Sequence, residues 1–231
     1  MNEKERKDLF GSDIANKYES QMQRSLPGRN DLYEIIAAYF NETLPEAGRI
    51  LVVGAGGGKE ILHFKKANPK WEITGIDPSL DMIETARENL RSNNILAELH
   101  HCYLEDLPAG DPFDAATSIL VSHFIRTYEE KLESLREISA RLKSGGPFVM
   151  VSLYGNNNDA EYKFIQKVWH RYMLAKGIEH DDLEEHKNKR EEHIFPVSDG
   201  THRELLAEAG FTDIIEFFSA FHFKGWFAKK A

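Results

Sequence analysis

An apolar run at Ile50–Val53 that leads directly into glycines constrains the fold of this chain more than any other feature. A short continuous apolar run before a turn is typical of a strand buried on both faces. The glycines follow as Gly-x-Gly-x-Gly at positions 54, 56 and 58, where a helix is predicted to start. Backbone that carries no Cβ atoms can approach a ligand closely. The segment therefore predicts an α/β fold with a ligand site at the end of this strand.

Strand and helix patterns alternate through the first two thirds of the chain. Apolar runs predict further strands at 71–76, 114–121 and 147–153, and amphipathic patterns predict helices at 31–40, at 79–90 and from Thr127 to the glycines at 145–146. This alternation favours a mainly parallel sheet covered by helices on both faces.

The pattern changes after Leu153. We expect a helix at 160–176, then a polar stretch at 179–193, and then a helix that a capping box at Thr201-His202-Arg203-Glu204 opens and Gly210 ends. The two closing strands, at 211–218 and 221–229, are separated by so few residues that they must be antiparallel neighbours.

Composition excludes several classes of protein. The 29 Lys and Arg against 38 Asp and Glu give a net charge of −9, which disfavours direct binding to nucleic acid and to anionic membranes. The single cysteine, Cys102, cannot form a disulfide within the chain. The opening residues are charged with no apolar run behind them, and no run approaches the roughly 20 residues of a membrane span. We therefore expect a cytoplasmic protein.

Asp77 at the end of the second predicted strand indicates what the glycine turn binds. It follows Gly58 by nineteen residues, a spacing at which a carboxylate accepts hydrogen bonds from ribose hydroxyls. A dinucleotide site is the second choice, because that fold prefers Gly-x-Gly-x-x-Gly and because Glu60 is an acid near the position of a pyrophosphate. A tight turn without a ligand is the remaining alternative. The residues thus favour a nucleoside cofactor.

These residues resemble those of class I S-adenosylmethionine (SAM) dependent methyltransferases over about Arg49 to Leu153. The matching segments are Val53–Gly58, Gly75–Ile83, Leu104–Pro108 with Phe113-Asp114, and Leu142–Gly146. The resemblance implies a Rossmann-like seven-stranded sheet of order 3-2-1-4-5-7-6, with strand 7 antiparallel. It implies one domain over 1–231, with an N-terminal helical cap at 1–45 and a helical insertion at 154–200 that forms part of the acceptor pocket.

The same resemblance assigns the cofactor residues. Asp77 is expected to hold the ribose, and Met82 and its neighbours to pack on adenine. The family often has an acid where Val52 stands, and an adenine-binding Asp where Tyr103 stands, so Leu104 is expected to supply a backbone contact instead. The full set of expected SAM-binding residues is Arg24, Gly54, Ala55, Gly56, Gly58, Asp77, Pro78, Met82, Tyr103, Leu104 and Leu120.

The flanks resemble carboxy-S-adenosylmethionine synthases and related small bacterial methyltransferases. The resemblance rests on the segments Tyr18–Gly28, Thr201-His202 and Ala209–Phe211. It implies that the first of them, which includes Arg24, closes over the methionine end of SAM. It also implies that Lys189 or Arg190 pairs with an added carboxylate, although a basic residue in this Glu-rich stretch also fits a plain surface charge.

Methyl transfer needs few catalytic residues, because it is an in-line displacement that depends on positioning and exclusion of water. The aromatic residues Tyr18, Phe124, Trp169 and Tyr172 are expected near the sulfonium, with core packing as the alternative. His123, just after the fourth strand, is the candidate general base. The expected catalytic residues are His123, Tyr18 and Tyr172, and the expected substrate-binding residues are Trp169 and Arg190.

No metal site is expected, because only Asp182 and His186 in the His- and acid-rich stretch have the helical spacing of a ligand pair. Cys102 is a weaker candidate still, because no neighbouring residue marks its thiol as activated.

The favoured function is methyl transfer from SAM to a small molecule. The alternatives are an enzyme that modifies SAM itself, either as a carboxy-SAM synthase for tRNA wobble-uridine modification or by cyclisation or lyase chemistry, and a SAM-binding module without catalysis. A homodimer contact would use the aromatic-rich helix at 154–176.

Overall fold

The computed structural model describes residues 20–156, 159–183 and 192–231. The strands are β1 (Arg49–Val53), β2 (Glu72–Asp77), β3 (Glu98–His101), β4 (Ala115–Ile119), β5 (Pro147–Leu153), β6 (Phe211–Ala220) and β7 (Phe223–Lys230). The α-helices that concern us are α3 (Arg29–Thr43), α4 (Lys59–Ala67), α5 (Leu80–Ser92), α6 (Tyr128–Ala140), α7 (Ala160–Ala175) and α9 (Asp199–Glu208). Two short 3-10 helices are η1 (Leu104–Asp106) and η2 (Ser122–Phe124).

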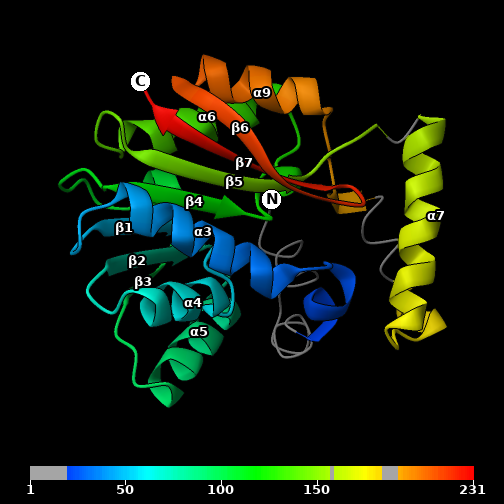
Figure 1. The fold of residues 1–231 in the computed structure, drawn as a ribbon, viewed down its shortest axis with the longest axis horizontal. Coiled ribbons are helices and arrows are strands. Elements are labelled where there is room, and N and C mark those ends of the chain that lie inside the picture. The colour runs from blue at the N-terminus through cyan, green and yellow to red at the C-terminus, as the bar shows by residue number, and fades with distance from the viewer. Residues whose placement is uncertain (1–19, 157–158, 184–191) are drawn as a thin grey trace.

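All seven strands form one sheet, in the order β3-β2-β1-β4-β5-β7-β6 (Figure 1). β1 pairs in parallel with β2 and β4, and parallel pairing continues to β3 on one side and β5 on the other. β7 runs antiparallel to both β5 and β6. The expected strand order and the antiparallel seventh strand are confirmed.

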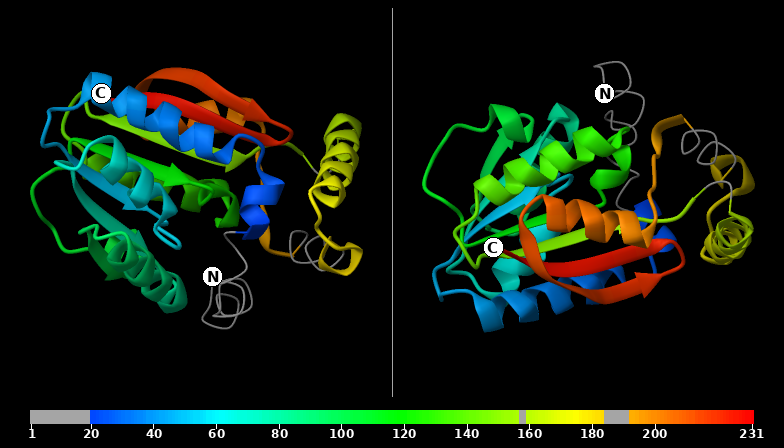
Figure 2. Two further views of the ribbon diagram at one scale, coloured as in Figure 1. Left: turned by 60° about the horizontal axis from the view of Figure 1, so that its bottom comes forward. Right: turned by 90° about the horizontal axis from the view of Figure 1, so that it is seen from above.

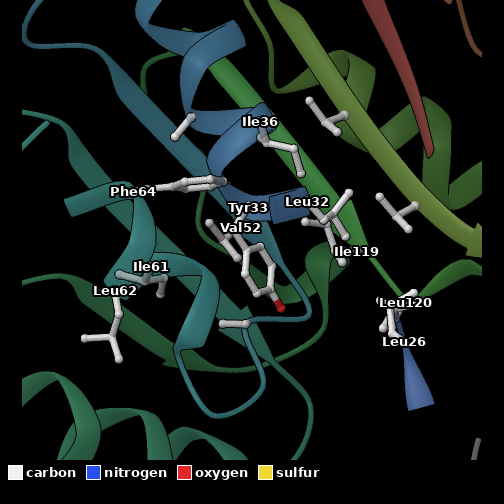
Figure 3. Close-up of a cluster of buried hydrophobic side chains, with 14 of the residues drawn as sticks. Leu26, Leu32, Tyr33, Ile36, Val52, Ile61, Leu62, Phe64, Ile119 and Leu120 are labelled. Atoms are coloured by element: carbon white, nitrogen blue, oxygen red, sulfur yellow. The ribbon is translucent and has the colours of Figure 1, made fainter. Parts of the chain in front are cut away.

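Helices cover both faces of the sheet. α3, α4 and α5 lie on one face, and α6 and α9 lie on the other (Figure 2). Each face has its own apolar cluster, because successive residues of β1 point to opposite sides: Val52 belongs to the cluster under α3 and α4, and Leu51 to the cluster under α6 and α9. Figure 3 shows the first cluster, where side chains from α3, β1, α4 and the end of β4 meet.

Local sequence signals explain most helix starts. Ser79 caps α5 by accepting a hydrogen bond from the Met82 backbone N–H, and Thr127 and Glu130 form the predicted capping box of α6. The predicted start of α9 at Thr201 is wrong. Ser198 caps that helix instead, by accepting a hydrogen bond from the Thr201 backbone N–H at 3.0 Å.

α7 lies beyond the edge of the sheet toward which β4 points (Figure 1). Its residue Trp169 is only 1% exposed, and the indole N–H donates to the backbone oxygen of Ser25 at 2.6 Å. This contact joins α7 to the segment before α3. Within the described ranges, no helix is both long enough and apolar enough to cross a membrane.

Candidate functional site

A cavity of about 350 Å³ opens at the carboxyl ends of the parallel strands. The residues that follow β1, β2, β3 and β4 all contribute to its wall, because parallel strands bring their carboxyl ends to one edge of the sheet. The cavity therefore lies where the strand order reverses, between β1 and β4. Its lining includes Val53, Gly54, Gly56, Ile76, Asp77, Pro78, Met82, Cys102, Tyr103, Leu104, Ile119, Leu120, Val121, Phe124, Ile125, Arg126, Glu130, Ser134, His193 and Phe195.

The glycine turn has a backbone that only glycine adopts easily. Gly54, Gly56 and Gly58 have φ angles of 77°, 49° and 78°, in the left-handed region. A Cβ at Gly54 would lie 2.3 Å from the Val121 side chain, whereas a Cβ at Gly56 would meet no atom of the described residues within 4 Å. Because Gly56 lines the cavity, a side chain there would take up space that a ligand needs.

Asp77 ties the glycine turn to the end of β2. Its carboxylate accepts hydrogen bonds from the backbone N–H of Gly56 and of Ser79, both at 2.9 Å. Burial raises the pKa of Asp77 above its usual range, although these two backbone donors and the charge of His101 act in the opposite direction. A carboxylate fixed by two donors retains lone pairs that can accept from ligand hydroxyls. Asp77 is thus oriented for the role that the sequence predicts.

Leu120, immediately after β4, has an unusual backbone conformation. Its φ is 61°, a left-handed value that costs a non-glycine residue about 1–2 kcal/mol. Its backbone N–H donates to the Val151 oxygen at 2.7 Å, and its side chain lines the cavity. Strained residues held by their neighbours are common at ligand sites.

The predicted SAM-binding residues divide into two groups. Those that the structure brings together on the cavity wall are Gly54, Gly56, Asp77, Pro78, Met82, Tyr103, Leu104 and Leu120. Ala55 and Gly58 lie in the same turn but do not line the cavity, and a Cβ at Gly58 would lie 3.1 Å from Ala86. Arg24 is exposed, and its guanidinium donates to the Gly177 oxygen at 3.0 Å, after α7.

The predicted catalytic and acceptor residues are not placed on this wall. His123 is buried, and its Nδ1 accepts from the Leu153 backbone N–H at 3.4 Å. The Tyr172 ring packs near Phe221, and Trp169 lies in the core. Tyr18 and Arg190 lie outside the described residues. The roles proposed for all five residues therefore stay predictions.

Sequence reasoning missed one part of the wall, formed by Ile125, Arg126, His193 and Phe195. The Phe195 backbone N–H donates to the His123 oxygen at 2.8 Å, which brings the 192–197 segment against η2. No local motif signals such a contact, because it joins positions far apart in the chain.

Lys131 of α6 and Glu60 of α4 are buried ionisable residues next to segments that line the cavity. The Lys131 ammonium donates to the backbone oxygens of Ser122 and Ile125 at 2.5 and 2.6 Å, and burial lowers its pKa to about 8. Lys131 thereby fixes the η2 segment that carries Phe124. On the other face, burial raises the pKa of Glu60 to about 7, and its Oε1 has no hydrogen-bond partner among the described residues. Glu60 is the second residue of α4, directly after the glycine turn.

No group of three or more His, Cys, Asp or Glu in the described part of the chain is arranged to hold a metal ion. His186, one of the residues considered for such a site, lies outside the described ranges.

A family model and curated relatives both match this chain. Residues 50–146 match the family model described as a methyltransferase domain. Carboxy-S-adenosyl-L-methionine synthase from Campylobacter fetus is 23% identical over 224 residues, which is 96% of this chain and 94% of that protein.

Two solved structures share the fold. One is magnesium protoporphyrin IX methyltransferase from Synechocystis with bound SAH, at a TM-score of 0.71 and 13% identity, covering all of both chains. Another is the plantazolicin methyltransferase BpumL in complex with a triazolic desmethylPZN analog and SAH, at a TM-score of 0.71 and 16% identity over 98% of this chain and 95% of that chain.

The residues on the cavity wall fit the SAM cofactor. Gly56 leaves open the space that a ligand needs, and Asp77 presents a fixed carboxylate beside it. The match of residues 50–146 to a methyltransferase domain, together with these relatives, indicates a SAM-dependent transferase.

Proposed function

We propose that the enzyme transfers the methyl group of SAM to a small-molecule acceptor. One observation supports this most: a single cavity joins a cofactor wall to a second wall from outside the cofactor motifs. Gly56, Asp77 and Met82 belong to the first wall, and Phe124 and Phe195 to the second. A cofactor and an acceptor can therefore lie in contact there, in a cavity whose size suits small molecules.

The residues of this chain act by binding and positioning. Bound SAM supplies a methyl group activated by its sulfonium. Asp77 accepts hydrogen bonds from the ribose hydroxyls, while the turn at Gly54–Gly58 admits the rest of the cofactor close to the backbone. Phe124 and Phe195 exclude water from the acceptor side and present aromatic faces that favour a nearby cation.

A general base is needed only if the acceptor is a hydroxyl or a weakly acidic carbon. His123 is our candidate for it, and its ring must turn away from Leu153 to reach the cavity, because its Nδ1 faces the backbone there. The variant His123→Gln tests the role: kcat should fall while the KM for SAM stays the same.

Carboxy-SAM synthesis is the second candidate function. It is favoured by curated relatives of that name that align over nearly their full length with this chain. In that case a carboxyl group from a donor in the small-molecule pool replaces one hydrogen of the SAM methyl group, and no methyl group leaves SAM.

One experiment separates the two functions. The purified enzyme is incubated with methyl-labelled SAM and a small-molecule extract, and the products are followed by mass spectrometry. Methyl transfer predicts S-adenosylhomocysteine (SAH) and label in an acceptor. Carboxy-SAM synthesis predicts a labelled product heavier than SAM by one carboxyl group, and release of neither product contradicts both proposals.

We place the enzyme in the cytoplasm, on the basis of its single cysteine, and without nucleic acid or membrane as partner, on the basis of its net charge of −9. A homodimer would use the α7 face on which Phe164 is 64% exposed, and sedimentation of the purified protein tests this.

A further inference from the structure

Arg126 stands out on the acceptor side of the cavity. It lies between η2 and α6 and lines the cavity with Ile125 and Phe195. The chain as a whole is acidic, with 38 acidic against 29 basic residues, so a basic side chain is expected to form an ion pair with a carboxylate. Arg203, for comparison, lies within ion-pair distance of both Asp199 and Glu216.

No carboxylate of the described residues forms an ion pair with the Arg126 guanidinium. Glu130 also lines the cavity, but its carboxylate accepts from the Thr127 backbone N–H at 3.0 Å and from the Arg126 backbone N–H. These bonds lower the pKa of Glu130 and keep its charge at the start of α6. Among the described residues, His193 and its neighbour Glu192 also lie on this side, with His193 Nε2 3.6 Å from Glu192 Oε2.

The guanidinium instead lies over the Phe195 ring, with its central carbon 4.8 Å from the ring centroid. The ring is held in place, because the Phe195 N–H donates to the His123 oxygen and the Gly155 N–H donates to the Val197 oxygen at 3.0 Å. A guanidinium that lies against an aromatic ring still has the N–H groups at its edge available as donors to an oxyanion. Two of these donors form a planar fork that matches the two oxygens of a carboxylate.

We propose that Arg126 binds the carboxylate of the acceptor, which makes the acceptor a carboxylic acid. Phe124, Ile125 and Phe195 surround this cation with apolar surface, so the body of the acid is apolar, such as an aromatic ring. The inference rests on the proposed function, because it gives the chemical class of the acceptor for the same cavity.

The test uses the full chain saturated with SAH and four probes in matched pairs. Benzoate and phenylacetate are titrated by calorimetry against benzamide and phenylacetamide, which have the same shape without the charge, and inorganic phosphate is added as a second oxyanion. We expect the carboxylates to bind more tightly than their amides. Arg126→Gln should weaken carboxylate binding at least about 10-fold and leave the Kd for SAH unchanged. Arg126→Lys should restore part of the binding, because it keeps the charge without the fork.

Arg136→Gln is the matched control, since Arg136 is an exposed arginine of α6 that does not line the cavity. Equal binding of acids and amides overturns the inference, as does an Arg126→Gln variant that binds the acids normally. An equal loss of SAH affinity also overturns it, because Arg126 would then serve the carboxylate of the cofactor. Tighter binding of phosphate than of both acids overturns the carboxylate assignment.

A second readout uses the labelled reaction with the small-molecule extract. The labelled product should be an acid or the methyl ester of one, and its formation should fall in Arg126→Gln. Failure of the wild-type chain to bind SAH would contradict the proposed function itself. Normal SAH binding without any preference for acids would contradict this inference alone.

Discussion

Replacement of Asp77 tests the site most directly, because this carboxylate joins the glycine turn to the expected ribose position. It accepts from two backbone N–H groups at 2.9 Å and has lone pairs left for a ligand. A hydrogen bond to a charged group is worth about 1.5–3 kcal/mol, so the loss of a single ribose contact weakens binding about 10- to 100-fold. Asp77→Ala should weaken SAH binding by at least that factor.

Asp77→Asn adds a sharper comparison. The amide has nearly the same shape as the carboxylate, but its NH₂ group must face the N–H of either Gly56 or Ser79, where two donors meet. We therefore expect Asn to bind SAH almost as poorly as Ala does. Asp81→Asn is the control, because Asp81 lies four residues away, in the first turn of α5, and does not line the cavity.

The pH dependence of binding provides an independent measurement. Burial raises the pKa of Asp77, and ribose hydroxyls donate to its ionised form, so SAH affinity should decrease as the pH falls, starting above the usual range of an aspartate. Calorimetric titrations of the wild type and of Asp77→Asn across acidic pH measure both effects. Wild-type affinity in Asp77→Ala, with folding verified by circular dichroism, would refute the assignment of the ribose to Asp77.

Three further predictions concern the residues around the cavity. Gly54→Ala places a Cβ 2.3 Å from the Val121 side chain and should lower the Tm by about 5 °C or more, whereas Gly56→Ala meets no atom and should mainly weaken SAH binding; equal melting temperatures for the two variants would contradict this. Because the pKa of Glu60 is about 7 when folded, its contribution makes the protein less stable as the pH rises from about 4.5 to about 7, by roughly 3 kcal/mol in total; denaturant unfolding of Glu60→Gln should lack this slope. Lys131→Met removes the ammonium that donates to the Ser122 and Ile125 oxygens, although the Ser122 oxygen keeps the Ile125 backbone N–H as a donor at 3.1 Å; the variant should cost about 2 kcal/mol or more, and an unchanged urea midpoint would show that water replaces the ammonium.

The sequence predicts the fold best where the signal is local. The strand Pro147–Leu153 has the predicted bounds because all its residues except Ser152 are apolar and every residue is buried. β3, by contrast, is Glu-Leu-His-His at the edge of the sheet, and no such pattern marks an edge strand. The helix start at α9 was misplaced because Thr201 and Glu204 have the spacing of a capping box, while Ser198, the actual cap, has no acid three residues later.

The sequence signals for the cofactor side of the site are also local. One strand, one turn and Asp77 are enough to define it, and Asp77 lies on the cavity wall as expected. The acceptor side depends on where distant segments meet, as Phe195 and Arg126 do. His123 shows a further limit: its position after β4 places its backbone at the carboxyl edge of the sheet, but His123 does not line the cavity, and its Nδ1 accepts from the Leu153 backbone N–H.

The distribution of unfavourable conformations supports the same location for the site. Leu120 has a left-handed backbone and Asp77 is a buried carboxylate, so two costs of different physical origin lie at one sheet edge, beside a turn whose three positive φ angles require glycine. Hydrogen bonds hold both residues in place, from the Leu120 N–H to the Val151 oxygen and from the Gly56 N–H to the Asp77 carboxylate. A chain selected for stability alone would have no reason to concentrate these features, because a plain strand-to-helix turn needs none of them. Their coincidence is explained by a ligand that must approach the backbone closely and be held by one acid.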